Sequence, residues 1–506
     1  MKKILSLMLA VILLFSACAL SPEPKSPEEP SPSADSADAS EEKETLYLRV
    51  PYDFKEGISP YTTLSRSNRF ICGLIYRSMV TLTSSYRYET DLLSAIQTED
   101  NLTWYLYLDE GTTFPDGTEF TAYDLKYSIQ EAMKEGSYYA DSLDVISSVT
   151  VVNATCCRVI LHTASRYFPN LLTFPVISYE TIRNPLFFPG RYSFSEDGTY
   201  LFCNEKSNAP VVELIPSDDP DLLVYEMRMG RYDCIYCGDP MSLGTSSVGA
   251  LNGLQSNRMI YLGFNNSTGF THYSDFRKAV SAAIDYEYLC NYVYNHFAAE
   301  PRGIFNPDFY EVSYAGKRSL DVMSANLLLD DMGYTNRDGE NYRTNSRGNR
   351  ITLDFLVCSE SAIKVSTAKA IVDMLKGIGV AVEVTSLPYD SFIQALSEHR
   401  YDLYLAEVRL DADMNLSGLL TPRAYEFPDE EYINYGMDSY EGLYLKWLEY
   451  MSGTISTTEF GNAFAETMPY VPLCYTKSSV IFSRNLPFSF GGTDSDMFYD
   501  ILNWNN

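Results

Sequence analysis

Chemistry on metals or thiols would need cysteine and histidine residues at characteristic spacings. Cys234 and Cys237 form a C-x-x-C pair, but no second pair follows at the spacing of a zinc site. No two of the four histidines stand four residues apart (His162, His272, His296, His399). We therefore predict no metal site, no redox function and no cofactor.

Motifs of catalysis are missing from the sequence as well. It contains no H-E-x-x-H, no G-x-S-x-G, no phosphate-binding G-x-x-x-x-G-K and no dinucleotide-binding fingerprint. Residues 244–249, GTSSVG, have the wrong spacing for a nucleophile elbow. The protein is therefore not expected to be an enzyme.

The N-terminus has the pattern of an export signal. Lys2 and Lys3 precede an apolar stretch over residues 4–15, which is too short to span a bilayer. The following FSAC resembles the lipobox of bacterial lipoproteins, and this resemblance implies a signal peptide over 1–17 and a lipid on Cys18. An ordinary signal peptide cut near Ala17 or Ala19, with Cys18 incidental, is the alternative.

Residues 18–44 are rich in proline, serine and acidic residues and read as a disordered linker behind the anchor. The formal charge of −29 argues against nucleic acid and anionic lipid as partners. Membrane contact is thus expected through the lipid alone. Nine of the ten cysteines follow Cys18, and buried free thiols and one or two disulfides both stay open for them.

A strand, a turn and a capped helix are predicted early in the folded part of the chain. Residues 104–108 are β-prone, and Pro-Asp-Gly at 115–117 is a turn sequence. Thr121 and Asp124 have the spacing of a capping box at the start of a helix.

Strands and helices alternate in the second half. This order predicts an α/β domain with a largely parallel sheet. The expected helices are 274–285, 286–297, 321–334, 362–379 and 389–399, and the expected strands are 351–357, 380–387 and 401–408.

Seven segments in order resemble the family 5 extracellular solute-binding proteins, which include the oligopeptide-, dipeptide- and nickel-binding proteins of ABC importers. They are 104–129, with F-P-D-G-T-x-F-T-A-x-D, then PGRYSF (189–194), LGFNNS with FRKAVSAAID (262–285), ANLLLDDMGY (325–334), MLKGIGVAVEV (374–384), HRYDLYLAEV (399–408) and ETMPYVPLCY (466–475).

The resemblance implies a type II periplasmic-binding-protein fold, with two α/β lobes that close on a ligand about a two-crossing hinge. The lobes are then expected at 45–258 plus 476–506, with a subdomain near 76–165, and at 259–475, with the crossings near 258–264 and 472–477.

The resemblance also suggests ligand-binding residues. Asp413 falls on the Asp that takes the amino terminus of the ligand in peptide-binding members, while Arg409 and Leu410 replace their Gly-Trp pair. Arg409, Asn415 and Tyr61 are further candidates. A helix-capping role for Asp413 or Asp411 is the alternative.

Three functions are open. The first is capture of short peptides for an ABC permease and its ATPase, by a monomer on the outer face of the cytoplasmic membrane (periplasmic if the host has an outer membrane). The second is the same architecture for another solute, such as a nickel chelate, an opine, an oligosaccharide or a signalling peptide. The third is an envelope enzyme or structural lipoprotein.

Overall fold

The computed structural model describes residues 45–179, 186–205, 207–217, 219–238, 249–312, 318–422, 440–483 and 490–504. The expected signal peptide, Cys18 and the linker lie outside the described residues. Within those ranges, no helix combines the length and hydropathy of a membrane span.

The largest sheet, here the central sheet, is mixed. Its order is β11 (Cys234–Cys237), β19 (Tyr470–Phe482), β12 (Ala250–Phe264), β18 (Leu403–Arg409), β16 (Thr352–Cys358) and β17 (Ala381–Leu387), with β13 (Ala298–Ala299) beside β19. β16 pairs parallel with β17 and β18, as predicted. The remaining pairs are antiparallel. The prediction of a largely parallel sheet is therefore wrong for the sheet as a whole, because the alternation of strands and helices on which it rests covers only β16, β17 and β18.

The helices around the central sheet follow the predicted order. α8 packs against β16 and β17, and α9 packs against the same two strands. The helix expected at 286–297 ends early, at Val293, because Asn295 and His296 have left-handed backbone angles (φ 46° and 66°). The bounds are α5 (Ser274–Ala283), α6 (Tyr286–Tyr288), the π-helical turn η5 (Leu289–Val293), α7 (Val322–Asp331), α8 (Ala362–Gly377), α9 (Tyr389–Ser397), α10 (Ser417–Leu420), α11 (Glu441–Met451) and α12 (Thr457–Thr467), with a small hairpin of β14 (Asn336–Arg337) and β15 (Arg343–Thr344).

A second sheet carries the predicted strand, turn and helix. Its order is β4 (Leu93–Thr98), β5 (Thr103–Leu108), β7 (Cys156–Leu161) and β6 (Ile146–Asn153), and it is accompanied by β2 (Val80–Leu82), β3 (Tyr88–Thr90), α2 (Ala122–Ala132), α3 (Ala140–Leu143) and the 3₁₀ turn η1 (Phe168–Leu171). The capping box is confirmed, with Thr121 and Asp124 closing the start of α2. Apolar residues between Tyr61 and Phe188 fill the core here, called the β5 core.

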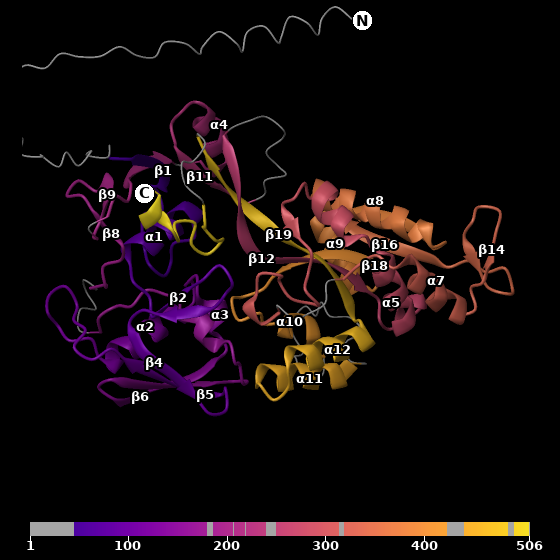
Figure 1. Cartoon of the computed structure of the whole chain (residues 1–506), viewed down its shortest axis with the longest axis horizontal. Helices are drawn as coiled ribbons and strands as arrows, with labels where there is room; N and C mark the ends of the chain where they lie inside the picture. The colour runs from indigo at the N-terminus through magenta and orange to yellow at the C-terminus, as the bar shows by residue number, and fades with distance from the viewer. Residues whose placement is uncertain are drawn as a thin grey trace, which may run out of the picture. The chain divides into compact units, whose positions relative to one another are not determined.

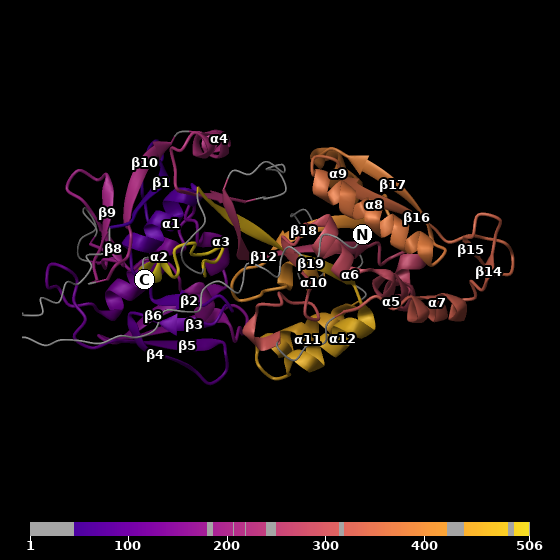
Figure 2. The ribbon, with the colours of Figure 1, turned by 45° about the horizontal axis from the view of Figure 1, so that its top comes forward.

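A third sheet orders β1 (Tyr47–Asp53), β10 (Val211–Ser217), β9 (Tyr200–Cys203) and β8 (Tyr192–Phe194), near α1 (Arg66–Ile75), α4 (Leu223–Arg228) and η9 (Ile501–Asn503). Figures 1 and 2 show the yellow C-terminal segment close to α1, where Phe498 packs on Phe70. This β1 core also takes Leu254 of β12 and Val480 of β19.

The long strands β12 and β19 therefore serve two cores. They pair with each other along most of their length (Figure 1). One end of the pair packs in the β1 core. The other end, with Met259–Phe264 of β12 and Tyr470–Tyr475 of β19, packs in the core of the central sheet. Seven of the nine described cysteines are buried.

Candidate ligand-binding site

The loop that follows β18 (residues 410–416, the β18 loop) is buried in its middle, together with one of its two carboxylates. Asp413 and Met414 are 1% and 0% exposed. Met414 adopts a left-handed backbone angle (φ 57°), which is uncommon for such a side chain. The Asn257 amide on β12 fixes the turn by donating to the carbonyl oxygen of Asp411 (2.9 Å). The loop thus holds Asp413 at one defined place.

The Asp413 carboxylate is buried without a cation. Its Oδ1 accepts the backbone N–H of Asn415 (3.2 Å), and no lysine, arginine or histidine of the described residues forms an ion pair with it. Burial, and then repulsion from Asp411, raise the pKa of Asp413 to about 7. Asp411 itself is exposed and accepts the Ser142 hydroxyl (2.8 Å). An uncompensated buried carboxylate is costly, and such groups gather at functional sites.

Buried amide side chains from other segments surround the β18 loop. Asn170, from η1 in the β5 core, donates to the carbonyl oxygens of Ala412 (2.9 Å) and Tyr86 (2.8 Å). Asn306 donates to the Asn257 side chain (3.3 Å). These contacts join the β5 core to the central sheet at the loop, so Asp413 lies where two separate cores meet.

A group of charged residues, here the arginine cluster, lies at the start of the same loop. It consists of Arg66 and Arg69 on α1, Arg409 at the end of β18, and Asp494 in the C-terminal segment. Asp494 pairs with Arg66 (2.5 Å) and Arg409 (3.6 Å). It also accepts the Tyr236 hydroxyl (3.0 Å). Although burial raises it, the pKa of Asp494 lies below its usual range because of Arg66 and Arg409.

Of the four ligand-binding residues predicted from sequence, three lie at this place. Arg409 belongs to the arginine cluster, and its side chain is 49% exposed. Asn415 is half-buried, donates its backbone N–H to Asp413, and accepts the N–H of Ser417 through its own side chain (2.9 Å). Tyr61 belongs to the β5 core, where its hydroxyl donates to a backbone carbonyl and its own carbonyl oxygen accepts the N–H of Tyr138 (2.7 Å).

The capping alternative for the two aspartates does not fit the structure. The short helix α10 begins at Ser417, its N-cap is Leu416, and no side chain caps it. Met414 is left-handed rather than helical. Asp413 therefore closes a turn on Asn415 and is not the cap of a helix starting near Met414.

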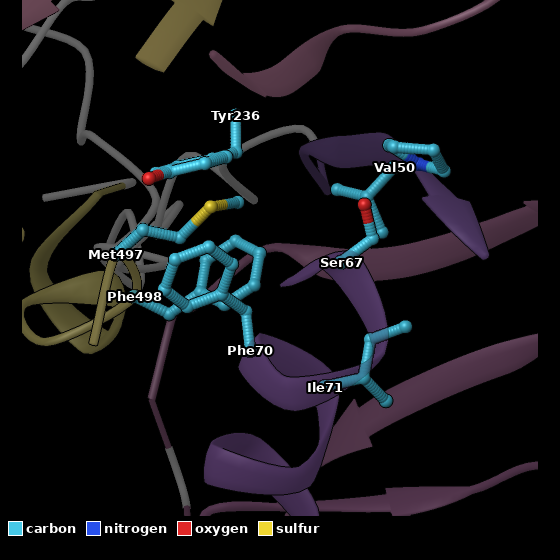
Figure 3. Close-up of a pocket in the computed structure, with 8 residues that line it drawn as sticks. Val50, Ser67, Phe70, Ile71, Tyr236, Met497 and Phe498 are labelled. Carbon is cyan, nitrogen blue, oxygen red and sulfur yellow. The ribbon is translucent and has the colours of Figure 1, made fainter. Parts of the chain in front are cut away.

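Side chains that line a small cavity beside α1 pack against Arg66 of the arginine cluster. Figure 3 shows the Phe70 ring facing Met497 and Tyr236 across this cavity. Its volume of about 10 Å³ has room for a water molecule rather than a solute. The Arg66 guanidinium lies over the Phe70 ring (5.2 Å) and the Tyr236 ring (5.1 Å), so this packing positions Arg66.

Sequence reasoning missed most of the groups that surround Asp413. Arg66 and Arg69 had only a weak signal, a spacing of three residues, which brings two side chains to one face only where the segment is helical. Asn170 and Asn306 had no signal, because an isolated asparagine has the same pattern as a turn residue. Among the described residues, no group of three or more His, Cys, Asp or Glu side chains is arranged to hold a metal ion.

The chain matches a family model over residues 87–210 and 237–423, more than half of its length. That model describes the middle part of the bacterial extracellular solute-binding proteins, family 5. No curated protein sequence matches the chain.

Solved structures of similar proteins share the fold at low sequence identity. NikZ from Campylobacter jejuni, in complex with Ni(L-His), is 18% identical, with a TM-score of 0.59 and coverage of 92% of this chain and 100% of NikZ. The periplasmic murein tripeptide binding protein MppA is 17% identical, with a TM-score of 0.67 and coverage of 87% and 93%. The oligopeptide-binding protein AppA from Bacillus subtilis, with a nonapeptide, is 15% identical, with a TM-score of 0.53 and coverage of 91% and 99%. The predicted two-lobed, type II fold is thereby confirmed.

Proposed function

The chain belongs to the bacterial extracellular solute-binding proteins of family 5, and on that premise we propose that it captures short peptides for an ABC importer. The observation that carries the peptide proposal is Asp413, a carboxylate buried to 1% exposure with no cation beside it among the described residues. A peptide ammonium group would supply that cation through a short charge-assisted hydrogen bond. The solved relatives that bind a murein tripeptide and a nonapeptide support this ligand class.

Closure of two lobes would bring the ligand-binding groups together. We propose lobes at 45–258 plus 476–506 and at 259–475, with β12 and β19 as the hinge strands. Both strands pass from one core to another, which is what a two-crossing hinge requires. Asp413, Arg409 and Asn415 would then contact the solute from the second lobe. Tyr61 is not carried into this site, because its hydroxyl is already engaged in the β5 core.

The N-terminus would anchor the protein to the surface of the membrane that carries the importer. We propose lipidation of Cys18 behind a signal peptide, and a flexible linker that leaves the lobes free to reach a permease and its ATPase as a monomer. Acyl chains contribute about 0.8 kcal/mol per buried CH₂ group, enough for durable anchoring when two or more are attached. Replacing Cys18 by serine should release the protein from the membrane fraction, and retention at wild-type levels would refute the anchor.

A metal chelate is the second candidate solute. Two of the similar structures are of nickel proteins, one with Ni(L-His) and one of a nickel ABC transporter from Bacillus halodurans. A chelate brings its own metal ligands, so it does not need a metal-binding cluster on the protein. Its amino groups could meet Asp413 as a peptide's would.

Native mass spectrometry of the protein as purified tests the proposal directly, because it reports the mass of any carried solute. Thermal unfolding with a mixed tripeptide pool is the second measurement. A pool at a hundredfold excess over Kd should stabilise the folded state by about 2.7 kcal/mol. A shift with Ni(L-His) and none with peptides would favour the chelate instead.

A further inference from the structure

The arginine cluster has more positive charge than its own carboxylate can neutralise. Arg66 and Arg69 stand three residues apart at the start of α1, which places them on one face of the helix. Asp494 neutralises one of the three guanidinium groups and is shared between Arg66 and Arg409. The cluster is thus left with an excess of two positive charges.

Arg69 is the member without a carboxylate. Its Nη1 donates to the carbonyl oxygen of Leu64 (2.7 Å), and its guanidinium lies 4.1 Å from the centre of the Tyr138 ring. No ion pair of Arg69 exists among the described residues. Arg66 also keeps an unused donor, since its Nε is buried without a hydrogen-bond partner. Two of the three arginines therefore have donors to spare.

The surroundings of the cluster do not supply the missing anion. Glu56 is the acidic residue nearest to Arg66 and Arg69 in the chain, but its carboxylate accepts the backbone N–H groups of Leu64 and Ser65 before α1. Near Arg409, Glu407 pairs with Arg258 and Lys364, and Asp411 accepts the Ser142 hydroxyl. The chain as a whole has a charge of −29, so an excess of arginine is local to this place. Burial raises the pKa of Tyr138, yet Arg409, Arg69 and Arg66 outweigh it and lower that pKa. The lowered pKa of the Tyr138 hydroxyl thus also indicates an excess of positive charge around it.

We propose that Arg66, Arg69 and Arg409 form a subsite for an oxyanion of the solute, a carboxylate or a phosphoryl group. This inference rests on the proposed function, since it assigns the oxyanion to the same solute whose ammonium group Asp413 binds. Arginine is suited to the task because its planar fork binds carboxylate and phosphate with two parallel hydrogen bonds. Arg69 determines the preference for an oxyanion over a neutral group, because Asp494 already pairs with Arg66 and Arg409.

The alternative role of Arg69 is packing on Tyr138. A packing role predicts equal effects of an Arg69 substitution on peptides with a charged and with an uncharged C-terminus, whereas the oxyanion subsite predicts a larger effect on the charged ones. The probes are a mixed tripeptide pool with free carboxylates and the same pool with C-terminal amides. Titration calorimetry of the wild type should show affinity for the amides weaker by about thirtyfold or more, roughly 2 kcal/mol. Arg69→Gln should weaken the affinity for the free-acid pool by about tenfold or more, and the affinity for the amide pool by less than about threefold.

A matched variant controls for the loss of an arginine stacked on tyrosine. Arg87 lies 4.7 Å from the centre of the Tyr310 ring, outside the cluster. Arg87→Gln should leave both affinities unchanged. Arg69→Lys should recover part of the preference for free acids, because it keeps the charge but not the fork.

The outcomes separate this inference from the proposed function. Equal affinity of the wild type for both pools, or equal losses in Arg69→Gln, would overturn the oxyanion subsite and leave peptide capture standing. If neither pool binds, peptide capture fails, and citrate and inorganic phosphate become the probes. Binding of citrate alone would identify the oxyanion as a carboxylate, and binding of phosphate alone would identify it as a phosphoryl group. In either case Arg69→Gln should weaken binding of that anion by about tenfold. Binding of neither anion would overturn the subsite.

Discussion

The β18 loop and the arginine cluster are neighbouring regions with opposite imbalances of charge. In the loop, Asp413 is buried without a cation, and its pKa is raised to about 7. In the cluster, Asp494 is buried among arginines and its pKa is lowered. The same type of side chain thus lacks a cation in one region and has two in the other, although Arg409 of the cluster stands only a few residues before Asp413 in the chain.

This difference indicates what each carboxylate is for. Asp494 has its partners within the chain, so it organises the cluster in the absence of any ligand. Asp413 has no cationic partner among the described residues, so a cation that offsets its desolvation has to come from outside them. A solute with an ammonium group at one end and an oxyanion at the other would compensate both regions together.

The largest expected effect is the loss of affinity in Asp413→Ala. If Asp413 binds the solute's ammonium group, the mutant should bind the free-acid tripeptide pool more weakly by about 3–5 kcal/mol, a hundredfold to several thousandfold. Acetylating the amino ends should cause a similar loss in the wild type and add little in the mutant, because both changes remove one contact. Calorimetry measures all four affinities.

Asp411→Ala is the matched control for this cycle, because it removes an exposed negative charge two residues away. It loses a hydrogen bond to Ser142, and its effect on affinity should stay within about fivefold. Additive losses from acetylation and Asp413→Ala would remove Asp413 from the site.

Without ligand, Asp413→Asn should stabilise the protein at high pH. The carboxyl of Asp413 has a folded-state pKa of about 7 against an ordinary 3.8, so the folded wild type loses stability as the pH rises through this window. The amide never ionises, and its gain should therefore reach roughly 4 kcal/mol above pH 7 and vanish near pH 4. Urea unfolding at several pH values measures the difference. A gain in unfolding free energy that does not depend on pH would contradict the raised pKa of Asp413.

Asp494→Asn should have the opposite sign. The pKa of Asp494 is lowered, so its contribution to stability is present above the ordinary carboxyl pKa and is lost as the pH falls below it. The mutant should lose about 3 kcal/mol at neutral pH, because Arg66 is left buried without a carboxylate. The loss should shrink below pH 4 in the same urea series. Two variants with the same sign at neutral pH would refute the contrast between the two regions.

The sequence was sufficient for the elements and not for the environment of the site. Local signals located α2, α8 and the three parallel strands, because caps, turns and hydrophobic spacing act over a few residues. The antiparallel pairing of β12 with β19 joins segments more than two hundred residues apart in the chain, and no local pattern encodes it. Asp413 was reached through the family motif, whereas Asp494 lay in a C-terminal segment without one.

The smallest expected effect is that of Asn415→Ala, and it decides whether Asn415 contacts the solute. The substitution keeps the backbone N–H that Asp413 accepts, and removes the side-chain oxygen that accepts the N–H of Ser417. Losing that bond at the start of α10 should cost about 1 kcal/mol of unfolding free energy. If Asn415 only supports the turn, the affinity for the tripeptide pool should change by less than about threefold. A loss of affinity of about tenfold or more, with the same small loss of stability, would instead assign Asn415 a direct contact, since a support role weakens folding and binding together.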